Sequence, residues 1–221
     1  MCGRYTIALD LNQALAEMNL DLPEFDFEPR FNIAPSQRLP VILDEAPQKA
    51  QLLKWGLVPF WAKDPKIGYK MINALGETVH EKPSFRNAFK RRRCLILADG
   101  FYEWQKRPDG KQPHHIHLKN RELMTFAGLW ESWRDAEERE MRTFTIITTT
   151  PNVLMEPLHN RMPTIIAPED RSVWLAPESN AETLRSLIQP YAADQMEALP
   201  VSTQVNNVRN DAPELIDPIE A

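Results

Sequence analysis

The second residue of the chain, Cys2, has the most distinctive chemistry. It follows Met1, and initiator methionine is commonly removed before a residue as small as cysteine. Removal would leave an α-amine and a thiol on adjacent carbons. The α-amine has an ordinary pKa of about 7.7–8.0, so much of it is neutral and nucleophilic near pH 7. Such a group forms an imine with an aldehyde, and its thiol can then close a five-membered thiazolidine ring. The plainer alternative is a small residue at a terminus.

Three polar residues stand within otherwise apolar, strand-like sequence: Asn73, Glu103 and His159. Glu103 lies between Tyr102 and Trp104, and desolvation by such neighbours raises a carboxyl pKa toward the range useful for general acid catalysis. Histidine can move protons near neutral pH. Each residue also has a structural interpretation: an asparagine in a turn, a solvent-facing glutamate on a strand, and a histidine satisfied by its neighbours.

The elements that must position these residues are mostly short strands. Runs rich in β-branched and aromatic residues predict strands at 39–43, 50–58, 94–98, 100–105, 114–118, 123–130, 142–150 and 198–203. Helical spacing and start signals predict helices at 10–18, 83–93, 168–175 and 180–188. Strands dominate without regular βα alternation, so the pattern predicts an α+β fold rather than a doubly wound sheet. The acidic, proline-containing tail after about Arg209 is expected to be loosely held.

Composition bounds the class of protein. The 221 residues suit one large domain, and no apolar run is long enough for a transmembrane helix. Two cysteines exclude a disulfide framework and CxxC zinc sites, so we expect a reducing, cytoplasmic location. Seven glycines, with no GxGxxG or GxxxxGK[ST] motif, disfavour nucleotide cofactors. We therefore expect no cofactor and no membrane association.

Charge is uneven along the chain. The formal net charge is −5, yet residues 86–107 carry seven Lys and Arg against two Asp and Glu. Local fields steer ligands more than total charge does. The run from Lys90 to Arg93 is either part of a binding surface or a solvated helix end, where cations are favourable.

Several distinctive blocks of sequence follow one another along the chain. It starts Met-Cys-Gly-Arg-Tyr, and the later blocks are RFNIAP at 30–35, WGLVPFW at 55–61, INA at 72–74 with ET at 77–78, CLILADGFYEW at 94–104 and HNRMP at 159–163. In type and order, through about Asp217, these blocks resemble the SRAP family of SOS response-associated peptidase proteins. The resemblance implies one domain over residues 1–221, with β-sheets forming a barrel-like core flanked by helices.

The resemblance also implies a function: covalent capture of abasic sites in single-stranded DNA, protecting them during the DNA damage response. It implies that Cys2 forms the thiazolidine crosslink, that Asn73 positions its amine, that Glu103 is the general acid and base, and that His159 assists imine formation and reversal. The implied partner is single-stranded DNA with an abasic site, bound by a protein expected to be a monomer. The implied DNA contacts come from Arg4, Trp61, Thr148 and Arg161.

Two departures from the family pattern bear on DNA affinity. Leu75 stands where the family usually has a phosphate-binding arginine, a role that Lys70 or Arg86 could take instead. Ala62 stands where some members have a second tryptophan. The histidines of PHHIH at 113–117 suggest a metal site only weakly, because no carboxylate or cysteine pair joins them in sequence, and we expect no metal.

Other functions remain open at this level. A thiol autopeptidase, the activity in the family's name, needs a leading segment to remove, whereas only Met1 precedes Cys2. An abasic-site lyase would cleave the strand from the imine. A noncovalent single-stranded DNA-binding module would bind in a salt-dependent manner, indifferent to the abasic site. Cys94 and Trp130, by contrast, are expected to be packing residues.

Overall fold

The computed structural model describes residues 2–220, and short strands account for most of its regular structure. The predicted removal of Met1 concerns a residue outside this range. The strands are β1 (Tyr5–Ile7), β2 (Arg30–Ile33), β3 (Arg38–Leu43), β4 (Ala46–Trp55), β5 (Asn73–Leu75), β6 (Arg93–Ala98), β7 (Gly100–Arg107), β8 (Gly110–Leu118), β9 (Met124–Arg134), β10 (Glu140–Thr149), β11 (Met162–Pro163), β12 (Ile165–Ile166) and β13 (Met196–Pro200). The helices are α1 (Leu11–Glu17), α2 (Arg86–Arg91), α3 (Arg171–Leu175) and α4 (Ala181–Ser186), with 3-10 turns η1 (Pro65–Lys70), η2 (Pro168–Asp170), η3 (Ala193–Gln195), η4 (Thr203–Asn206) and η5 (Pro213–Ile216).

Five strands close into a barrel. The order β10-β4-β3-β6-β9 runs through one sheet, and β9 pairs again with β10 to complete the ring. The β10–β4 pair is short and parallel, whereas the other pairs of the ring are antiparallel. Closure removes the exposed edges that an open sheet would present. The α+β prediction with a barrel-like core is therefore confirmed.

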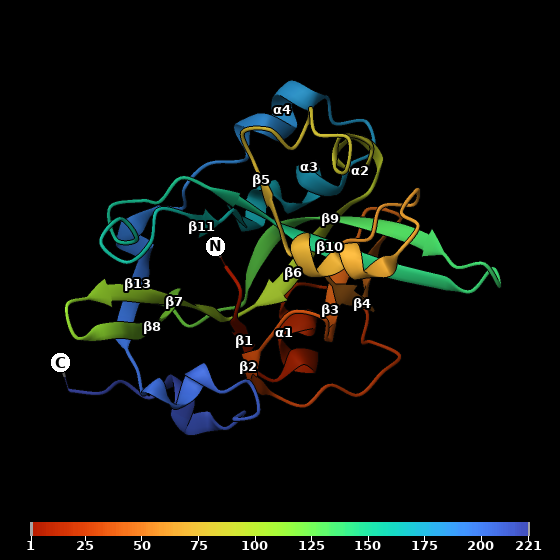
Figure 1. Cartoon of the computed structure of the whole chain (residues 1–221). Helices are drawn as coiled ribbons and strands as arrows, with labels where there is room; N and C mark the ends of the chain where they lie inside the picture. The colour runs from red at the N-terminus through yellow and green to blue at the C-terminus, as the bar shows by residue number, and fades with distance from the viewer. Residues whose placement is uncertain (1, 221) are drawn as a thin grey trace.

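β6 shows why its sequence is a continuous apolar run. Alternate residues Cys94 and Ile96 belong to the barrel interior, while Leu95 and Leu97 pack in a second cluster with helices α1 to α4. A strand covered on both faces needs apolar residues at every position. Figure 1 shows α2, α3 and α4 grouped above the sheets, where they cover this outer face.

A second sheet carries the start of the chain. Its order is β13-β8-β7-β1-β2, so the N-terminal strand β1 lies between β7 and β2 (Figure 1). This sheet is continued by β8 and β13, which pair antiparallel over Met196–Pro200. Residues close to the N-terminus therefore lie inside the molecule, beside a strand that is about a hundred positions later in sequence.

The helices are shorter than predicted, and their caps explain the limits. Asp10 and Asn180, predicted as the first residues of their helices, act as N-caps by accepting hydrogen bonds from Gln13 N and Thr183 N. The predicted helix at 83–93 forms only as α2, because the residues before it make turns. The predicted strand at 50–58 ends at Trp55, since Gly56 has a φ of +120°.

The tail after Arg209 corrects the prediction that it is loosely held. Leu215 is buried with Tyr102 in a small third cluster, and the Asp211 carboxylate accepts a hydrogen bond from Phe31 N. Pro218 pairs with Val201 in a bridge. These anchors are distant in sequence, so the polar, proline-containing composition of the tail gave no sign of them. Within residues 2–220 there is no helix long and apolar enough to span a membrane.

Candidate active site at the start of the chain

Cys2 lies fully buried just ahead of β1. Burial raises the pKa of its thiol far above the ordinary value, and the nearby Glu103 carboxylate raises that pKa further. β1 pairs with β7 through Tyr5 and Phe101, and Glu103 follows two residues later on β7. Strand pairing therefore brings together two residues a hundred positions apart, as the sequence-based grouping of Cys2 with Glu103 requires.

Asn73 contacts Cys2 directly. Its side-chain Nδ2 donates a 2.8 Å hydrogen bond to the carbonyl oxygen of Cys2. Asn73 begins β5, which is held parallel to β10 opposite Ile146. The side-chain Oδ1 of Asn73 is buried and has no hydrogen-bond partner among residues 2–220. One amide thus fixes the Cys2 backbone and keeps a buried acceptor close to it.

Glu103 is buried rather than solvent-facing. Its exposed fraction is 3%, and burial raises the pKa of its carboxyl to about 7. A carboxyl with this pKa is present in both protonation states near neutral pH, which suits it to give and take protons. The structural alternative for Glu103, a strand residue facing water, is therefore wrong.

His159 lies beside the site, directly after the turn at 153–158. Its Nδ1 accepts a 3.0 Å hydrogen bond from the backbone N–H of Arg161, so the neutral ring carries its proton on Nε2. Burial lowers the pKa of His159, which favours this neutral form. His159 and Arg161 come from the HNRMP block, and the short turn orients both side chains.

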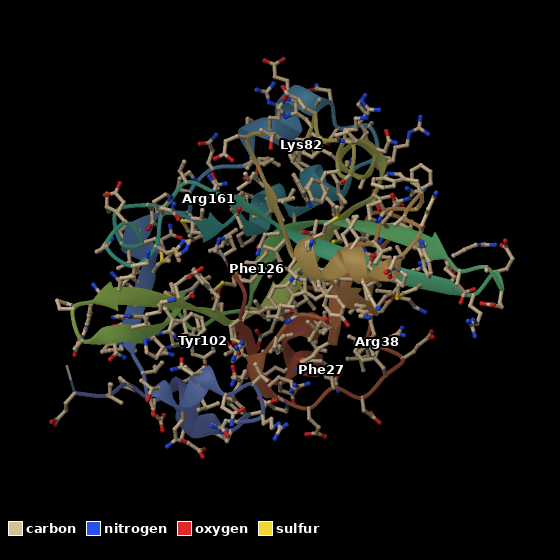
Figure 2. All side chains as sticks on the ribbon, viewed as in Figure 1. Phe27, Arg38, Lys82, Tyr102, Phe126 and Arg161 are labelled. Carbon is tan, nitrogen blue, oxygen red and sulfur yellow. The ribbon has the colours of Figure 1, made fainter. Side chains whose placement is uncertain are left out.

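Arg161 is already paired within the protein. Its guanidinium makes two hydrogen bonds to the carboxylate of Glu77, at 2.5 Å and 2.9 Å, and one of 2.6 Å to the carbonyl oxygen of Thr148. A guanidinium that binds a carboxylate through two parallel bonds has the geometry that also suits phosphate. In Figure 2 Arg161 and Tyr102 lie on the same side of the molecule, the side of the β7–β8 hairpin.

The N-terminal strand is fixed by a buried network that sequence reasoning missed. Asp99 accepts hydrogen bonds from Thr6 Oγ1, Ala8 N and Leu9 N at 2.5 to 2.8 Å. Thr6 Oγ1 also lies 3.1 Å from His115 Nε2. A side chain at Gly100 would put its Cβ 2.1 Å from this histidine nitrogen. In the sequence, this network was indicated only by the Asp-Gly pair at 99–100 in the ADGFYEW block.

Tyr5 is a second neighbour that sequence reasoning missed. Its ring packs on Trp55 and Phe126, with centroids 5.2 Å and 6.0 Å away. Its hydroxyl is buried without a hydrogen-bond partner among the described residues, and burial raises its pKa well above the ordinary value. Cys2 therefore has an aromatic, water-poor neighbourhood, in which electrostatic interactions are strong.

The chain also matches a known protein family. The family model described as "SOS response associated peptidase (SRAP)" matches residues 1–208. The chain belongs to the SRAP family. The "Abasic site processing protein YoqW" of Bacillus subtilis is 49% identical over 222 residues, which cover 98% of this chain and 99% of that protein. The "Abasic site processing protein HMCES" of Gallus gallus is 34% identical over 266 residues, covering 100% of this chain and 78% of that protein.

Solved structures agree on the SRAP fold. A protein of Bacteroides thetaiotaomicron superposes with a TM-score of 0.91 at 24% identity, covering 99% of this chain and all of that one. A protein of Bordetella bronchiseptica gives a TM-score of 0.79 at 25% identity, with 91% and 100% covered. The overall fold of this chain is therefore shared well beyond close sequence similarity.

The remaining residues of this SRAP protein that were expected to contact DNA differ in their surroundings. Arg4 Nη1 donates to Asn32 Oδ1 at 2.6 Å and to the Val205 carbonyl at 2.8 Å, and its guanidinium lies over Trp104. Thr148 is buried beneath Arg161. No hydrogen bond or ion pair within residues 2–220 joins Cys2 to the exposed side chains of Trp61, Lys70 or Arg86.

The two departures of this SRAP protein from the family pattern lie on different elements. Leu75, which replaces the usual arginine, is 46% exposed on β5, in register with Thr148. Ala62 is largely buried, and its carbonyl accepts a 2.7 Å hydrogen bond from Trp133 Nε1. Among the described residues no group of three or more His, Cys, Asp and Glu is arranged to hold a metal ion.

Proposed function

We propose that this SRAP protein captures abasic sites in single-stranded DNA by forming a thiazolidine between Cys2 and the ring-opened sugar. The names of its relatives refer to abasic sites, and these relatives match nearly the whole chain. The observation that carries the proposal is the contact of Asn73 with the Cys2 carbonyl, next to a buried carboxyl whose pKa is about 7. Together these residues can orient an N-terminal aminothiol and supply protons to it.

The chemistry begins once Met1 has been removed and the α-amine belongs to Cys2. The amine nitrogen bonds to the aldehyde carbon of the open sugar, and one water leaves to give an imine. The Cys2 sulfur then bonds to the same carbon, the electron pair of the C=N bond moves to nitrogen, and nitrogen takes the thiol proton. The product is a five-membered ring, and the sum of the steps is protein plus DNA less one water.

Each polar side chain has a part in these steps. Protonated Glu103 assists opening of the sugar ring and loss of water, and its carboxylate accepts protons from the amine. The Oδ1 of Asn73, buried and without a partner among residues 2–220, accepts a hydrogen bond from that amine. The Nε2–H of His159 donates toward the sugar oxygen. The raised pKa of the Cys2 thiol keeps its proton in place until the imine exists.

DNA binding supports the same reaction. Arg161 exchanges Glu77 for a phosphate beside the abasic nucleotide, because both anions fit its guanidinium. The exposed ring of Trp61 stacks on a neighbouring base, and Lys70 and Arg86 provide positive charge. One chain supplies all of these groups, so we infer that the active form is a monomer. We also infer a cytoplasmic location, because a chain with only two cysteines suits a reducing compartment.

Intact-mass spectrometry tests the proposal. A single-stranded oligonucleotide containing uracil is treated with uracil glycosylase and mixed with the protein, with the untreated oligonucleotide as control. The expected product is a heat-stable adduct whose mass is the chain without Met1 plus the DNA less one water. Peptide mapping then locates the attachment at Cys2.

Two cysteine variants separate the possible chemistries. Cys2→Ala keeps an α-amine and should form only an imine, which borohydride traps and heat reverses. Cys94→Ala removes the other buried thiol and should crosslink like the unchanged protein. An undiminished heat-stable adduct with Cys2→Ala would exclude the thiazolidine, and strand cleavage without an adduct would favour a lyase.

A further inference from the structure

Phe60 and Trp61 form a pair of exposed aromatic side chains on the loop between β4 and η1. Their exposed fractions are 55% and 50%. Large aromatic side chains contribute most when their surface is removed from water, so adjacent exposed rings indicate a surface that becomes covered. Both residues lie in the WGLVPFW block at 55–61, but the resemblance implies a DNA contact for Trp61 alone, and Phe60 has no role in the chemistry at Cys2.

The loop that carries these rings is held firmly. The Trp133 indole donates to the Ala62 carbonyl at 2.7 Å, and Val58 N donates to the buried Thr143 hydroxyl at 2.8 Å. The backbone of Phe60 lies near the buried Glu131 carboxylate and lowers its pKa, against the larger effect of burial. The exposure of Phe60 is therefore built into a fixed loop. A preformed surface orders few groups on binding and so keeps more of its interaction energy.

Positive charge surrounds Phe60. A surface pocket is lined by Phe60 together with residues from α2 and its C-terminal end, namely Asn87, Lys90, Arg91 and Arg92. Arg92 is paired with the buried Glu131, whereas Lys90 and Arg91 are exposed and form no ion pair within residues 2–220. On the other side of the loop a second hollow is lined by Trp61 with Lys63, Lys66 and Lys70.

We propose that Phe60, Lys90 and Arg91 form a second DNA-binding surface, which holds unpaired nucleotides of the strand beyond the base stacked on Trp61. A ring flanked by cations binds single-stranded nucleic acid through base stacking and phosphate contacts, without reading sequence. The chain as a whole carries −5, so this cluster marks a local path for a polyanion. The inference rests on the proposed function, because capture at Cys2 fixes the abasic nucleotide from which the rest of the strand extends.

Binding to a nonreactive abasic analogue tests this surface without the covalent step. A short oligonucleotide is centred on a tetrahydrofuran abasic analogue, and two longer ones extend it on the 5′ or the 3′ side. Phe60→Ala should weaken binding of at least one extended oligonucleotide by about five- to 150-fold, the range for loss of one stacked base. It should leave the short oligonucleotide unaffected.

A charge variant and its matched control complete the test. The slope of the logarithm of the binding constant against the logarithm of salt concentration, called the salt slope below, reports the number of phosphate contacts. Lys90→Ala/Arg91→Ala should lower its magnitude for that extended oligonucleotide by about 1.4. Lys111→Ala/Lys119→Ala removes the same charge from β8 and the residue that follows it, on the opposite side of Figure 1 from α2, and should leave the slope unchanged. Equal slopes for the two double variants, or an equal effect of Phe60→Ala on short and extended oligonucleotides, would overturn the proposal.

The proposed function is checked separately with the unchanged protein. Failure to crosslink the reactive abasic oligonucleotide would reject capture at Cys2, whatever the Phe60 variants do. Normal crosslinking together with unaltered binding by the Phe60 and α2 variants would reject only the second surface. An acidic peptide that competes for Phe60, with no effect of strand extension, would identify a protein partner and likewise reject DNA at this surface.

Discussion

The carboxylate of Glu77 lies against the guanidinium of Arg161 and accepts hydrogen bonds from both of its terminal nitrogens. Two hydrogen bonds join them, while Glu77 itself is half exposed and Arg161 is mostly covered. The pKa of Glu77 is lowered chiefly by its hydrogen bond to Arg161, so the carboxylate is charged near neutral pH. The free protein thus holds an internal anion at Arg161, and under the proposed function DNA has to displace it.

Glu77→Gln should therefore strengthen binding of the nonreactive abasic oligonucleotide. Exposed ion pairs contribute about 0.2–1 kcal/mol, so we expect roughly a 1.4- to fivefold gain in affinity. Fluorescence anisotropy measures it, with Glu182→Gln on α4 as a control that removes one negative charge elsewhere. Weaker binding by Glu77→Gln would instead mean that Glu77 is needed to orient Arg161.

Leu75 gives a prediction in the same region. It is exposed on β5 beside Thr148, where the family usually has arginine. Leu75→Arg should add one phosphate contact, tighten DNA binding, and steepen the salt slope for single strands by about 0.7. Leu75→Gln is the matched control, because it removes the same apolar side chain without adding charge. Identical slopes for the two variants would show that position 75 is out of reach of the strand.

Glu103 should set the pH dependence of crosslinking. Its pKa of about 7 means that the acid form is lost as the pH rises through that value. The crosslinking rate of the unchanged protein should accordingly fall above about pH 7. Deprotonation of the α-amine acts in the opposite direction, because the neutral amine is the nucleophile. Glu103→Gln should slow crosslinking by about 10²- to 10⁴-fold and lack that fall. A rate–pH profile with the same descending limb in the variant would exclude Glu103 as the acid.

Stability gives an independent check on the same carboxyl. The folded pKa lies above the ordinary value of 4.5, so the folded state binds the proton more tightly than the unfolded state. The stability that Glu103 contributes is fully present below about pH 4.5 and is lost as the pH rises through about 7. Urea unfolding of Glu103→Gln against the unchanged protein should therefore show the variant gaining relative stability across this range. A difference independent of pH would contradict the raised pKa.

Arg93 should be essential for stability rather than for DNA binding. It is fully buried, and its guanidinium donates to the carbonyls of Phe89, Lys90, Trp174 and Ala176. Arg93→Met leaves these carbonyls without their donor, which we expect to lower the free energy of unfolding by about 3–5 kcal/mol. Urea denaturation measures this loss. The exposed neighbour Arg91 is the control, since Arg91→Met should change stability by no more than about 0.5 kcal/mol.

The run from Lys90 to Arg93 shows how far its sequence could be interpreted. The two sequence-based alternatives, a binding surface or a solvated helix end, both treated the run as one unit. The structure divides it: Lys90 and Arg91 are exposed, Arg92 pairs with Glu131, and Arg93 is buried between α2 and α3. Four adjacent cations look alike in sequence, and only the packing of the helix end against the barrel distinguishes them.

Local chemistry by itself determined which residues matter at the start of the chain. An N-terminal cysteine can act as an aminothiol wherever it lies, and alternating or continuous apolar runs predict strands without knowledge of their partners. The α+β class followed from those runs. The motif blocks, in their order, predicted the SRAP family and, by resemblance, a site made of Cys2, Asn73, Glu103 and His159.

Long-range pairing decided what sequence could not. The burial of Glu103, its pKa, and the hydrogen bond from Asn73 to Cys2 all depend on β1 pairing with β7 and on β5 pairing with β10. The same holds for the anchored tail and for Arg161, whose partner Glu77 lies 84 positions away. These contacts join segments whose own residues carry no local signal of the partner, so only closure of the barrel and the second sheet fixes them.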